Sequence, residues 1–403
     1  MQKILIRLFA ALLFFPTHFG WRSRKKIVFG AWHGARYSDN PRYLFEWLSE
    51  HTDWDLIWTG RKELAAQVKR ARPGVRFAKR GSLAALWHVL TAKAFVYCHN
   101  FWEDIGPFPI KQNLIRLNVT HGIPFKKLGA ESASKTEPRS MGVIERIRNV
   151  VDPFLFDDKV AVCVSSDGMA AAYKASWPEM FVEFIYAGTP RGDFMRNFAR
   201  DEKRIRELRD EYAKLLGIDA SKKWIIYMPT HRWTTMDLFS FASKVEDQAL
   251  ANVLKNKNAV IIEKPHFNSL QQRDAGNGNE RVCIINRALN GVVDASELLL
   301  AGDLLITDYS SCFFDFALMN RPVIHFAYDY EFYRNSDTGL RYELRDIAAG
   351  PVCESYDELL SALAQPECDL MATRGSRLND EMLYETGSAC EQIRDWLARR
   401  GVG

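Results

Sequence analysis

Short apolar runs alternate with amphipathic stretches along most of this chain of 403 residues. Each run has the length of a buried strand, and most are followed by apolar residues at helical spacing. Strands are predicted at residues 27–30, 55–58, 74–77, 94–97, 114–119, 160–164, 184–186, 224–229, 259–262, 304–307 and 323–326. Such alternation is typical of parallel sheets covered by helices on both faces, so the predicted fold class is α/β.

The chain is too long for one ordinary hydrophobic core and long enough for two domains. A charged helix is predicted from Arg200 to Leu216, and the alternation starts again at Trp224. We therefore predict an N-terminal domain over residues 27–205 and a C-terminal domain over residues 206–403.

Composition excludes several function classes. Hydrophobic residues make up 47% and charged residues 26%, which are globular values. A net charge of +4 lacks the dense basic stripe of a nucleic-acid binder, so no nucleic-acid partner is predicted. Seven scattered cysteines without a C-x-x-C pair argue against a disulfide framework or a zinc site and indicate a reducing compartment.

Residues 1–26 differ from the rest of the chain. The uncharged run 8–15 is short of the ~20 residues that a membrane span needs. Residues 16–19 make a poor signal-peptide cleavage region, and basic residues at 22 and 24–26 follow directly. We interpret this segment as an interfacial helix on an anionic membrane surface. The alternative is a buried first helix.

Polar residues concentrate where the predicted strands end, at 30–40, 120–128, 229–233, 264–267 and 307–315. Ligands of open α/β sheets bind beyond the carboxyl ends of the strands. Asp308, Tyr309, Ser310 and Ser311 open a helix directly after a strand. Free N–H groups at a helix start, with two hydroxyls beside them, form an anion site, although a plain serine cap is the simpler alternative.

Histidines and cations occupy the other strand ends. His121 lies beside Gly122 after an apolar strand, Arg232 is suited to bidentate phosphate contact, and Lys264 with His266 forms a second cationic cluster. Phosphoryl transfer depends chiefly on positioning and charge stabilisation, which this set of residues can supply.

Taken in order, the motifs resemble the CDP-glycerol glycerophosphotransferase family, whose members build teichoic acids and related capsule polymers. The matching segments are 37–44, 120–129, 188–193, 227–232, 303–326, 350–352 and 385–389. Each motif alone is weak, but the ordered set is specific and covers about residues 27 to 397.

The resemblance implies a glycosyltransferase-B-like fold, with two Rossmann-like domains facing each other across a cleft. It implies that His121 is a general base for the acceptor hydroxyl, and His266 is a second catalytic candidate. The predicted donor-binding residues are Pro229, Thr230, Arg232, Lys264, Asp308, Ser310, Ser311 and Asp315. The predicted acceptor-side residues are His33, Asp39, Asn40 and Lys126.

The implied enzyme moves glycerol phosphate, or a related alditol phosphate, from a CDP-linked donor to a hydroxyl of a teichoic-acid-like or capsular polymer or its lipid-linked primer, releasing CMP. We expect it to be peripheral, at the cytoplasmic face of the cell membrane. Neither a P-loop nor a Gly-x-Gly-x-x-Gly motif occurs, which weighs against ATP and nicotinamide use. No metal ligands are predicted; Mg²⁺ arriving with the donor phosphates is the one cofactor left open.

Three departures from the family pattern leave the donor and acceptor open. Ile123 replaces a small hydroxyl residue, His266 follows Pro265 where the family has the reverse order, and Thr338 replaces an arginine before Gly339. The alternative functions are a glycosyltransferase that uses a nucleotide sugar and a non-catalytic membrane-bound scaffold.

Overall fold

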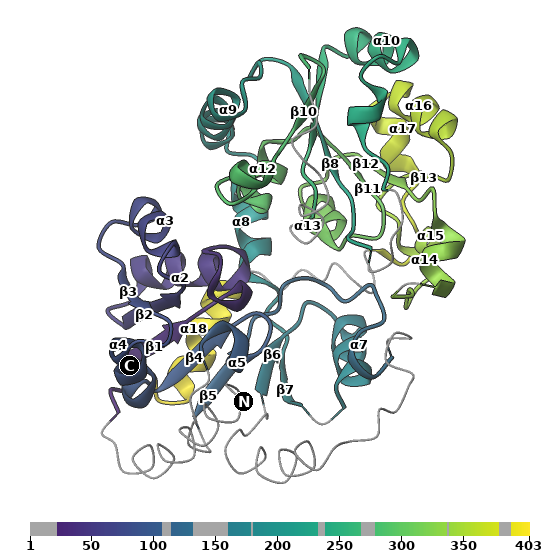
Figure 1. Ribbon diagram of the computed structural model, residues 1–403. Coiled ribbons are helices and arrows are strands. Elements are labelled where there is room, and N and C mark those ends of the chain that lie inside the picture. The colour runs from purple at the N-terminus through teal and green to yellow at the C-terminus, as the bar shows by residue number, and fades with distance from the viewer. Residues whose placement is uncertain are drawn as a thin grey trace, which may run out of the picture. The chain divides into compact units, whose positions relative to one another are not determined.

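The computed structural model describes residues 22–106, 114–131, 160–178, 180–232, 238–266, 279–336, 338–378 and 388–403. The chain forms two compact units. The first takes the described residues up to 121, those between 137 and 193, and those after 385. The second takes those from 122 to 136 and from 194 to 384. Each unit has one parallel sheet with helices around it, which confirms the predicted α/β class (Figure 1).

The first sheet has seven parallel strands in the order β3-β2-β1-β4-β5-β6-β7. They are β1 (Lys26–Phe29), β2 (Asp55–Gly60), β3 (Arg76–Lys79), β4 (Ala94–Tyr97), β5 (Ile115–Asn118), β6 (Val160–Cys163) and β7 (Phe181–Ile185). The helices of this unit include α2 (Asp39–His51), α3 (Leu64–Ala71), α4 (Leu83–Thr91), α5 (Phe101–Asp104), α7 (Asp167–Ser176), the start of α8 (Pro190–Phe198) and α18 (Ala389–Arg399). Strand order reverses between β1 and β4, the point where ligands of such sheets bind.

The second sheet repeats this topology, in the order β10-β9-β8-β11-β12-β13. Its strands are β8 (Lys223–Met228), β9 (Ala259–Glu263), β10 (Val282–Ile284), β11 (Leu304–Thr307), β12 (Val323–Phe326) and β13 (Val352–Cys353). Its helices are α9 (Glu202–Leu216), α10 (Gln248–Asn256), α11 (Arg287–Asn290), α12 (Ala295–Ala301), α13 (Cys312–Leu318), α14 (Tyr330–Ser336), α15 (Leu344–Ile347), α16 (Tyr356–Ala364) and α17 (Glu367–Ala372). Helices α9 and α12 cover one side of this sheet, and α10, α16 and α17 cover the other (Figure 1). The switch point lies between β8 and β11.

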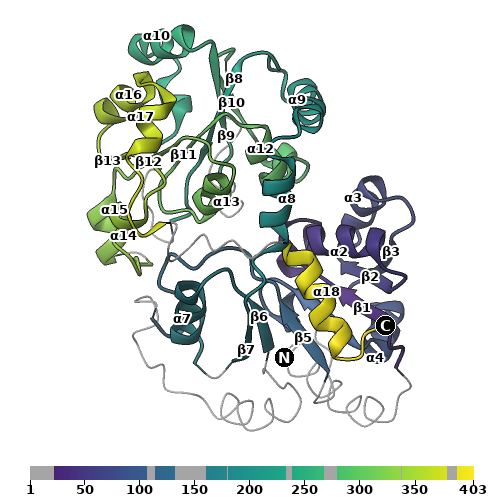
Figure 2. The same cartoon turned by 180° about the vertical axis from the view of Figure 1, so that it is seen from behind.

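The C-terminal helix departs from the predicted domain boundary, because α18 packs in the first unit rather than the second (Figure 2). Ile393, Trp396 and Leu397 of α18 lie in the same buried cluster as Ile27 and Phe29 of β1. This apolar face can be buried only against a core, and the first sheet supplies it. Residues 122–131 likewise belong to the second unit, although the prediction placed them in the first.

Within the ranges just given, no helix is long and apolar enough to cross a bilayer. The predicted membrane-associating segment lies outside the described residues up to position 21.

Candidate active site

Strained backbone marks the carboxyl edge of the first sheet. Six non-glycine residues of the described chain have a positive φ, and four of them follow β1 or β5: Trp32 (49°), His33 (56°), Asp39 (69°) and Thr120 (61°). Side chains rarely adopt this conformation, and it persists where surrounding contacts hold it, often at functional sites. Gly30 permits a close approach here, because a Cβ at that position would lie 2.4 Å from the carbonyl oxygen of Asp104.

Asp39 and Asn40 tie this edge together from the start of α2. The Asp39 carboxylate accepts hydrogen bonds from Arg191 Nη1 at 2.6 Å and Trp32 Nε1 at 3.0 Å. Asn40 accepts the backbone N–H of Arg191 at 2.8 Å and donates to the carbonyl of Thr120 at 3.1 Å. Both residues are buried and organise the loops around them. Their direct contact with an acceptor stays a prediction.

His121 follows β5, and its Nδ1 lies 3.3 Å from the carbonyl oxygen of Cys98. A carbonyl only accepts hydrogen bonds, so Nδ1 carries the proton and Nε2 keeps its lone pair. Burial lowers the pKa of His121 to about 3, with a smaller contribution from His99, so the ring is neutral at physiological pH. A neutral imidazole whose Nε2 keeps its lone pair can accept a proton, as a general base must.

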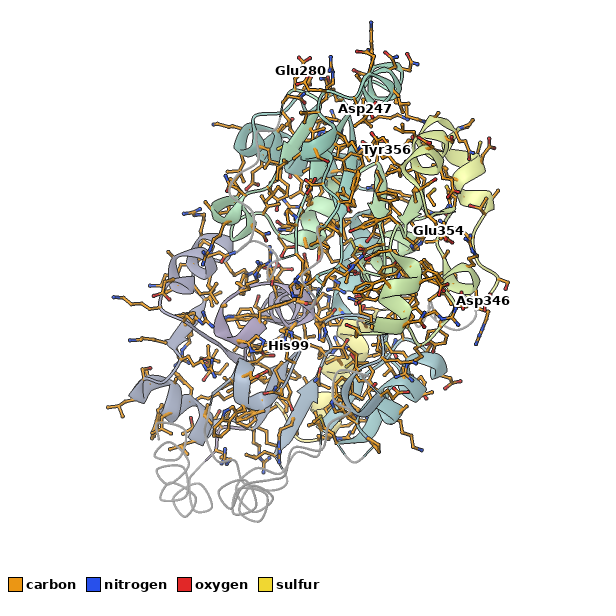
Figure 3. The ribbon with its side chains drawn as sticks, turned by 45° about the vertical axis from the view of Figure 1, so that its right-hand side comes forward. His99, Asp247, Glu280, Asp346, Glu354 and Tyr356 are labelled. Carbon is orange, nitrogen blue, oxygen red and sulfur yellow. The ribbon has the colours of Figure 1, made fainter. Side chains whose placement is uncertain are left out.

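His99, labelled in Figure 3, follows β4 and stacks on His121 with ring centroids 4.5 Å apart and planes at 6°. Buried Asp104 accepts the backbone N–H groups of Cys98 at 3.0 Å, His99 at 2.8 Å and His33 at 2.9 Å. Burial alone would lower the pKa of His99, but hydrogen bonding to Asp104 and its negative charge outweigh burial and raise that pKa. His33 lies beside this pair, its ring centroid 5.1 Å from that of His99.

In the second unit, Asp308 occupies the switch point between β8 and β11. Its carboxylate accepts the backbone N–H groups of Thr230 at 2.8 Å and Tyr309 at 2.6 Å, and Arg232 Nη2 at 2.9 Å. Burial raises the pKa of Asp308, but Arg232 and Thr230 outweigh burial and hold that pKa below its ordinary value. Asp308 is thus an ionised centre that joins the ends of the two strands.

Arg232 is buried, and its guanidinium contacts carboxylates and aromatic rings of the protein. Its Nε lies 2.7 Å from Asp329 Oδ2, and its Cζ lies 5.0 Å and 4.7 Å from the ring centroids of Tyr309 and Tyr333. The sequence predicted a bidentate grip on a donor phosphate. In the structure Arg232 lies in an ion-pair triad with Asp308 and Asp329, because a buried guanidinium needs compensating carboxylates, and its phosphate contact stays a prediction.

Lys126 belongs to the second unit, whereas the other predicted acceptor-side residues belong to the first. It forms an isolated antiparallel bridge with Leu340, and its Nζ lies 5.9 Å from the ring centroid of Tyr333. Its charge also contributes to the low pKa of Asp308. The loop after β5 passes from one unit to the other, which local sequence spacing cannot reveal. Lys126 therefore lies in the same unit as the predicted donor residues, and its acceptor-side role stays a prediction.

Lys264 and His266 follow β9, as predicted. Lys264 Nζ donates to Asn290 Oδ1 at 2.9 Å, and the Asn290 amide donates to the Pro265 carbonyl at 3.0 Å. The ring of His266 stacks with that of His231 at a centroid distance of 5.6 Å. Because β8 pairs with β9, the two strand ends bring these imidazoles together.

Ser310 and Ser311 precede α13, as predicted. Ser311 occupies the N-cap position, but its hydroxyl makes no cap hydrogen bond to the described helix, so the simple-cap alternative lacks support. Both serines are partly exposed, whereas Asp315 and Pro229 are buried. Phosphate contact by these residues stays a prediction.

Cys98, His99 and Asp104 are the one cluster of three possible metal ligands within the described residues. Both Asp104 oxygens, however, accept backbone N–H groups, Oδ1 from His33 and Oδ2 from Cys98 and His99. These bonds account for the carboxylate as a loop anchor, and we assign no metal to it.

Three central residues were absent from the predicted set: His99, Asp104 and Asp329. A signal for His99 existed, because it directly follows the strand beside the first switch point, where ligands gather. Asp104 and Asp329 lie beyond short loops, and nothing in the neighbouring sequence distinguishes them.

Two Rossmann-like units, one with a neutral histidine and the other with Lys126, Arg232 and Lys264 near the strand ends, are typical of a nucleotide-dependent group transferase. The profile of the family "CDP-Glycerol:Poly(glycerophosphate) glycerophosphotransferase" matches residues 13–397. The chain belongs to this family, as the ordered motifs predicted.

Relatives and solved structures agree with this membership. The teichoic acid poly(glycerol phosphate) polymerase of Bacillus spizizenii is 28% identical over 387 residues, which cover 93% of this chain and 92% of the relative. The teichoic acid glycerol-phosphate transferase of Staphylococcus aureus is 27% identical over 350 residues, which cover 85% and 84%. The wall teichoic acid polymerase TagF has the same fold, with a TM-score of 0.72 at 22% identity over 94% of this chain and 90% of that one.

Proposed function

We propose that this enzyme transfers glycerol phosphate, or a related alditol phosphate, from a CDP-linked donor to a hydroxyl group of a teichoic-acid-like polymer or its lipid-linked primer. The observation that carries the proposal is the family match over residues 13–397. The matched region includes the strand ends around His121 in the first unit and those around Asp308 in the second. The acceptor oxygen attacks the glycerol-linked phosphorus, the bond to CMP breaks, and CMP leaves.

The first unit supplies the base. His121 is neutral, and its Nδ1–H is directed to the Cys98 carbonyl, so Nε2 is the nitrogen that takes the proton of the acceptor hydroxyl. Removing this proton as the oxygen attacks phosphorus is general-base catalysis. Strain at Trp32, His33 and Thr120 supports this assignment, because the fold stabilises a costly backbone at this edge.

The second unit holds the donor phosphates. Lys126 and Lys264 bring positive charge to strand ends near the switch point, and Ser310 and Ser311 bring hydroxyl donors. His266 is placed here as a donor-side catalytic candidate. Asp308 and Asp329 are both paired with Arg232, so we propose that any Mg²⁺ comes with the donor pyrophosphate rather than from a carboxylate site.

We also propose that the enzyme works at the cytoplasmic face of the membrane. The apolar and basic segments before residue 27 support this, and so does one face of α4. Leu83 and Trp87 lie one turn apart on that helix with 84% and 61% of their surface exposed. Leucine and tryptophan together on an exposed face suit the boundary between lipid headgroups and acyl chains.

A panel of donors tests the activity. The full-length chain is incubated with a teichoic-acid-type acceptor and CDP-glycerol, CDP-ribitol or a nucleotide sugar, with and without EDTA, and released nucleotide and product linkage are measured. We expect CMP release and a new phosphodiester only with a CDP-alditol. A new glycosidic bond would identify a glycosyltransferase, and inactivity with every donor would favour a scaffold.

A further inference from the structure

Three histidines converge at the first switch point. The ring of His99 stacks on that of His121 at 4.5 Å, and the ring centroid of His33 lies 5.1 Å from that of His99. Trp32 contacts two of these rings edge-on, with centroid distances of 4.8 Å to His99 and 6.3 Å to His121. The three imidazoles come from loops after three different strands, so the fold brings them together.

The middle ring has the strongest reason to carry a positive charge. Asp104 Oδ2 lies 3.6 Å from His99 Nδ1, and Asp104 is fully buried and ionised. The neighbouring carboxylate favours the protonated imidazole. The side chain of His99 is 17% exposed and that of His33 is 46% exposed, so both rings reach solvent.

Arginines and carboxylates are equal in number around this cluster, so the charge of His99 decides the balance. The charged groups that face it from the surrounding elements are Arg36, Arg80 and Arg191 on one side of the balance and Asp39, Glu103 and Asp104 on the other. Asp39 is paired with Arg191, and Asp104 is bonded to three backbone N–H groups. Glu103 Oε2 lies 3.3 Å from His33 Nδ1 and offsets one cation, so the positive charge of His99, with Arg80 beside His33, is what suits an anion here.

We propose that His99 and His33 form a binding site for the terminal phosphate of the acceptor, and that filling this site makes His121 a stronger base. The idea rests on the proposed function, because it assigns the acceptor a phosphate next to the attacking hydroxyl. A charged ring stacked at 4.5 Å opposes a second proton on His121. A bound phosphate cancels that charge, so His121 gains basicity only when an acceptor is present.

Glycerol 3-phosphate is the probe for this site. The full-length protein, labelled with ¹³C at histidine Cε1, is titrated with it, and the resonances of His33, His99 and His121 are followed from about pH 5 to about pH 8. We expect saturable shifts at His33 and His99, and the onset of His121 protonation at the acid end only when the probe is bound. His99→Phe keeps a stacked ring without its charge. The dissociation constant for the probe, read at His33, should rise about tenfold or more, as for loss of a charge-assisted hydrogen bond.

His51→Phe is the matched control, because His51 also stacks on an aromatic ring, that of Trp47, but on an exposed part of α2. It should leave both readouts unchanged. His99→Gln serves if the phenylalanine variant does not fold. The proposal is overturned if the folded His99 variant binds the probe as tightly as the wild type does. It is also overturned if the probe does not change the protonation of His121 in the wild type. These titrations need no turnover, so their result is independent of the CMP-release assay. Either proposal can therefore fail while the other holds.

Discussion

Burial separates the motif residues that can reach a substrate from those that position other groups. Arg191, Asp39 and Arg232 all match family motifs, yet each is buried in an ion pair. His121 also matches a motif, but its Nδ1 is directed to the backbone carbonyl of Cys98, which leaves the chemistry to Nε2. Substitutions at these residues should therefore give different kinds of defect.

Replacing His121 should damage catalysis more than donor binding. In His121→Gln, we expect CMP release to fall by about 10²–10⁴-fold, the usual contribution of a general base, with little change in affinity for CDP-glycerol. Steady-state kinetics and calorimetric titration with the donor measure the two effects, and His51→Gln is the control. Turnover close to that of the wild type would exclude the base assignment.

Replacing Arg232 should damage stability first. In Arg232→Ala, Asp308 and Asp329 stay buried without a counter-charge, and breaking such a pair typically costs about 3–5 kcal/mol. Arg345→Ala removes an ion pair with Glu354 whose side chains are 59% and 47% exposed, and should cost less than about 1 kcal/mol. Urea unfolding compares the two. A stable, folded Arg232→Ala protein that has lost only donor affinity would support the predicted direct contact with the donor phosphate.

His325 should make the second unit sensitive to acid. Its Nε2 accepts the backbone N–H of Ala349 at 3.0 Å, and burial lowers the pKa of its ring from 6.5 to about 4. Between these two pKa values the unfolded chain binds a proton at His325 and the folded chain does not. The free energy of unfolding therefore falls as pH drops from 6.5 to about 4, and His325 leaves it unchanged at higher pH. The slope should approach about 1.4 kcal/mol per pH unit. Denaturation from about pH 7 to about pH 4 should show a shallower decline in His325→Gln, and equal slopes would count against this account.

At the scale of elements, the sequence predicted helices and strands better than it predicted which side chains contact each other. Every predicted strand is present because each is an apolar run long enough to show its pattern. Strands β10 and β13, with 3 and 2 residues, are too short to show one and were missed. Ser82 caps α4, since its hydroxyl oxygen accepts the N–H of Ala85 at 3.2 Å.

The site was predicted by position rather than by contact. Strand ends located His121, Lys264 and His266 correctly, because ligands of parallel sheets gather there. Pairings such as Arg232 with Asp329 join residues 97 positions apart, and no local pattern encodes them. The unit to which Lys126 belongs was not predictable for the same reason, since the crossing of its loop between units is a property of the whole fold, and its acceptor-side role stays a prediction.

Asp193, which lies in one of the family motifs, caps the C-terminal helix α18. Its carboxylate accepts the N–H groups of Ala389 at 2.9 Å and Cys390 at 2.8 Å, and so caps α18 from α8. In Asp193→Asn, loss of this charged cap should cost about 1–2 kcal/mol and loosen the C-terminal helix. Hydrogen exchange of α18 would detect the change. Asp210→Asn, on the exposed face of α9, should leave that exchange unaltered, and equal protection in both variants would refute the capping role.

For the whole molecule, the proposed membrane attachment predicts which surface faces the lipid. Arg22 Nη1 donates to the carbonyls of Val89 at 3.3 Å and Ala92 at 2.9 Å, so Arg22 lies at the end of α4. The same helix exposes Leu83 and Trp87. Exposed Arg24 and Lys25 follow at once, and basic residues near anionic headgroups contribute roughly 1 kcal/mol each.

Two surface substitutions on α4 should therefore weaken membrane attachment without unfolding the protein. Because Leu83 and Trp87 are exposed, replacing both with serine removes apolar area from the lipid contact but not from the core. We expect less of the variant to float with anionic vesicles than of the wild type, and the difference to persist at high salt, which screens only the basic residues. Leu215→Ser with Val292→Ser, at sites 38% and 52% exposed in the second unit, is the matched control. Equal flotation of both double variants would show that α4 lies away from the bilayer, and deleting residues 1–22 would then test the N-terminal segment alone.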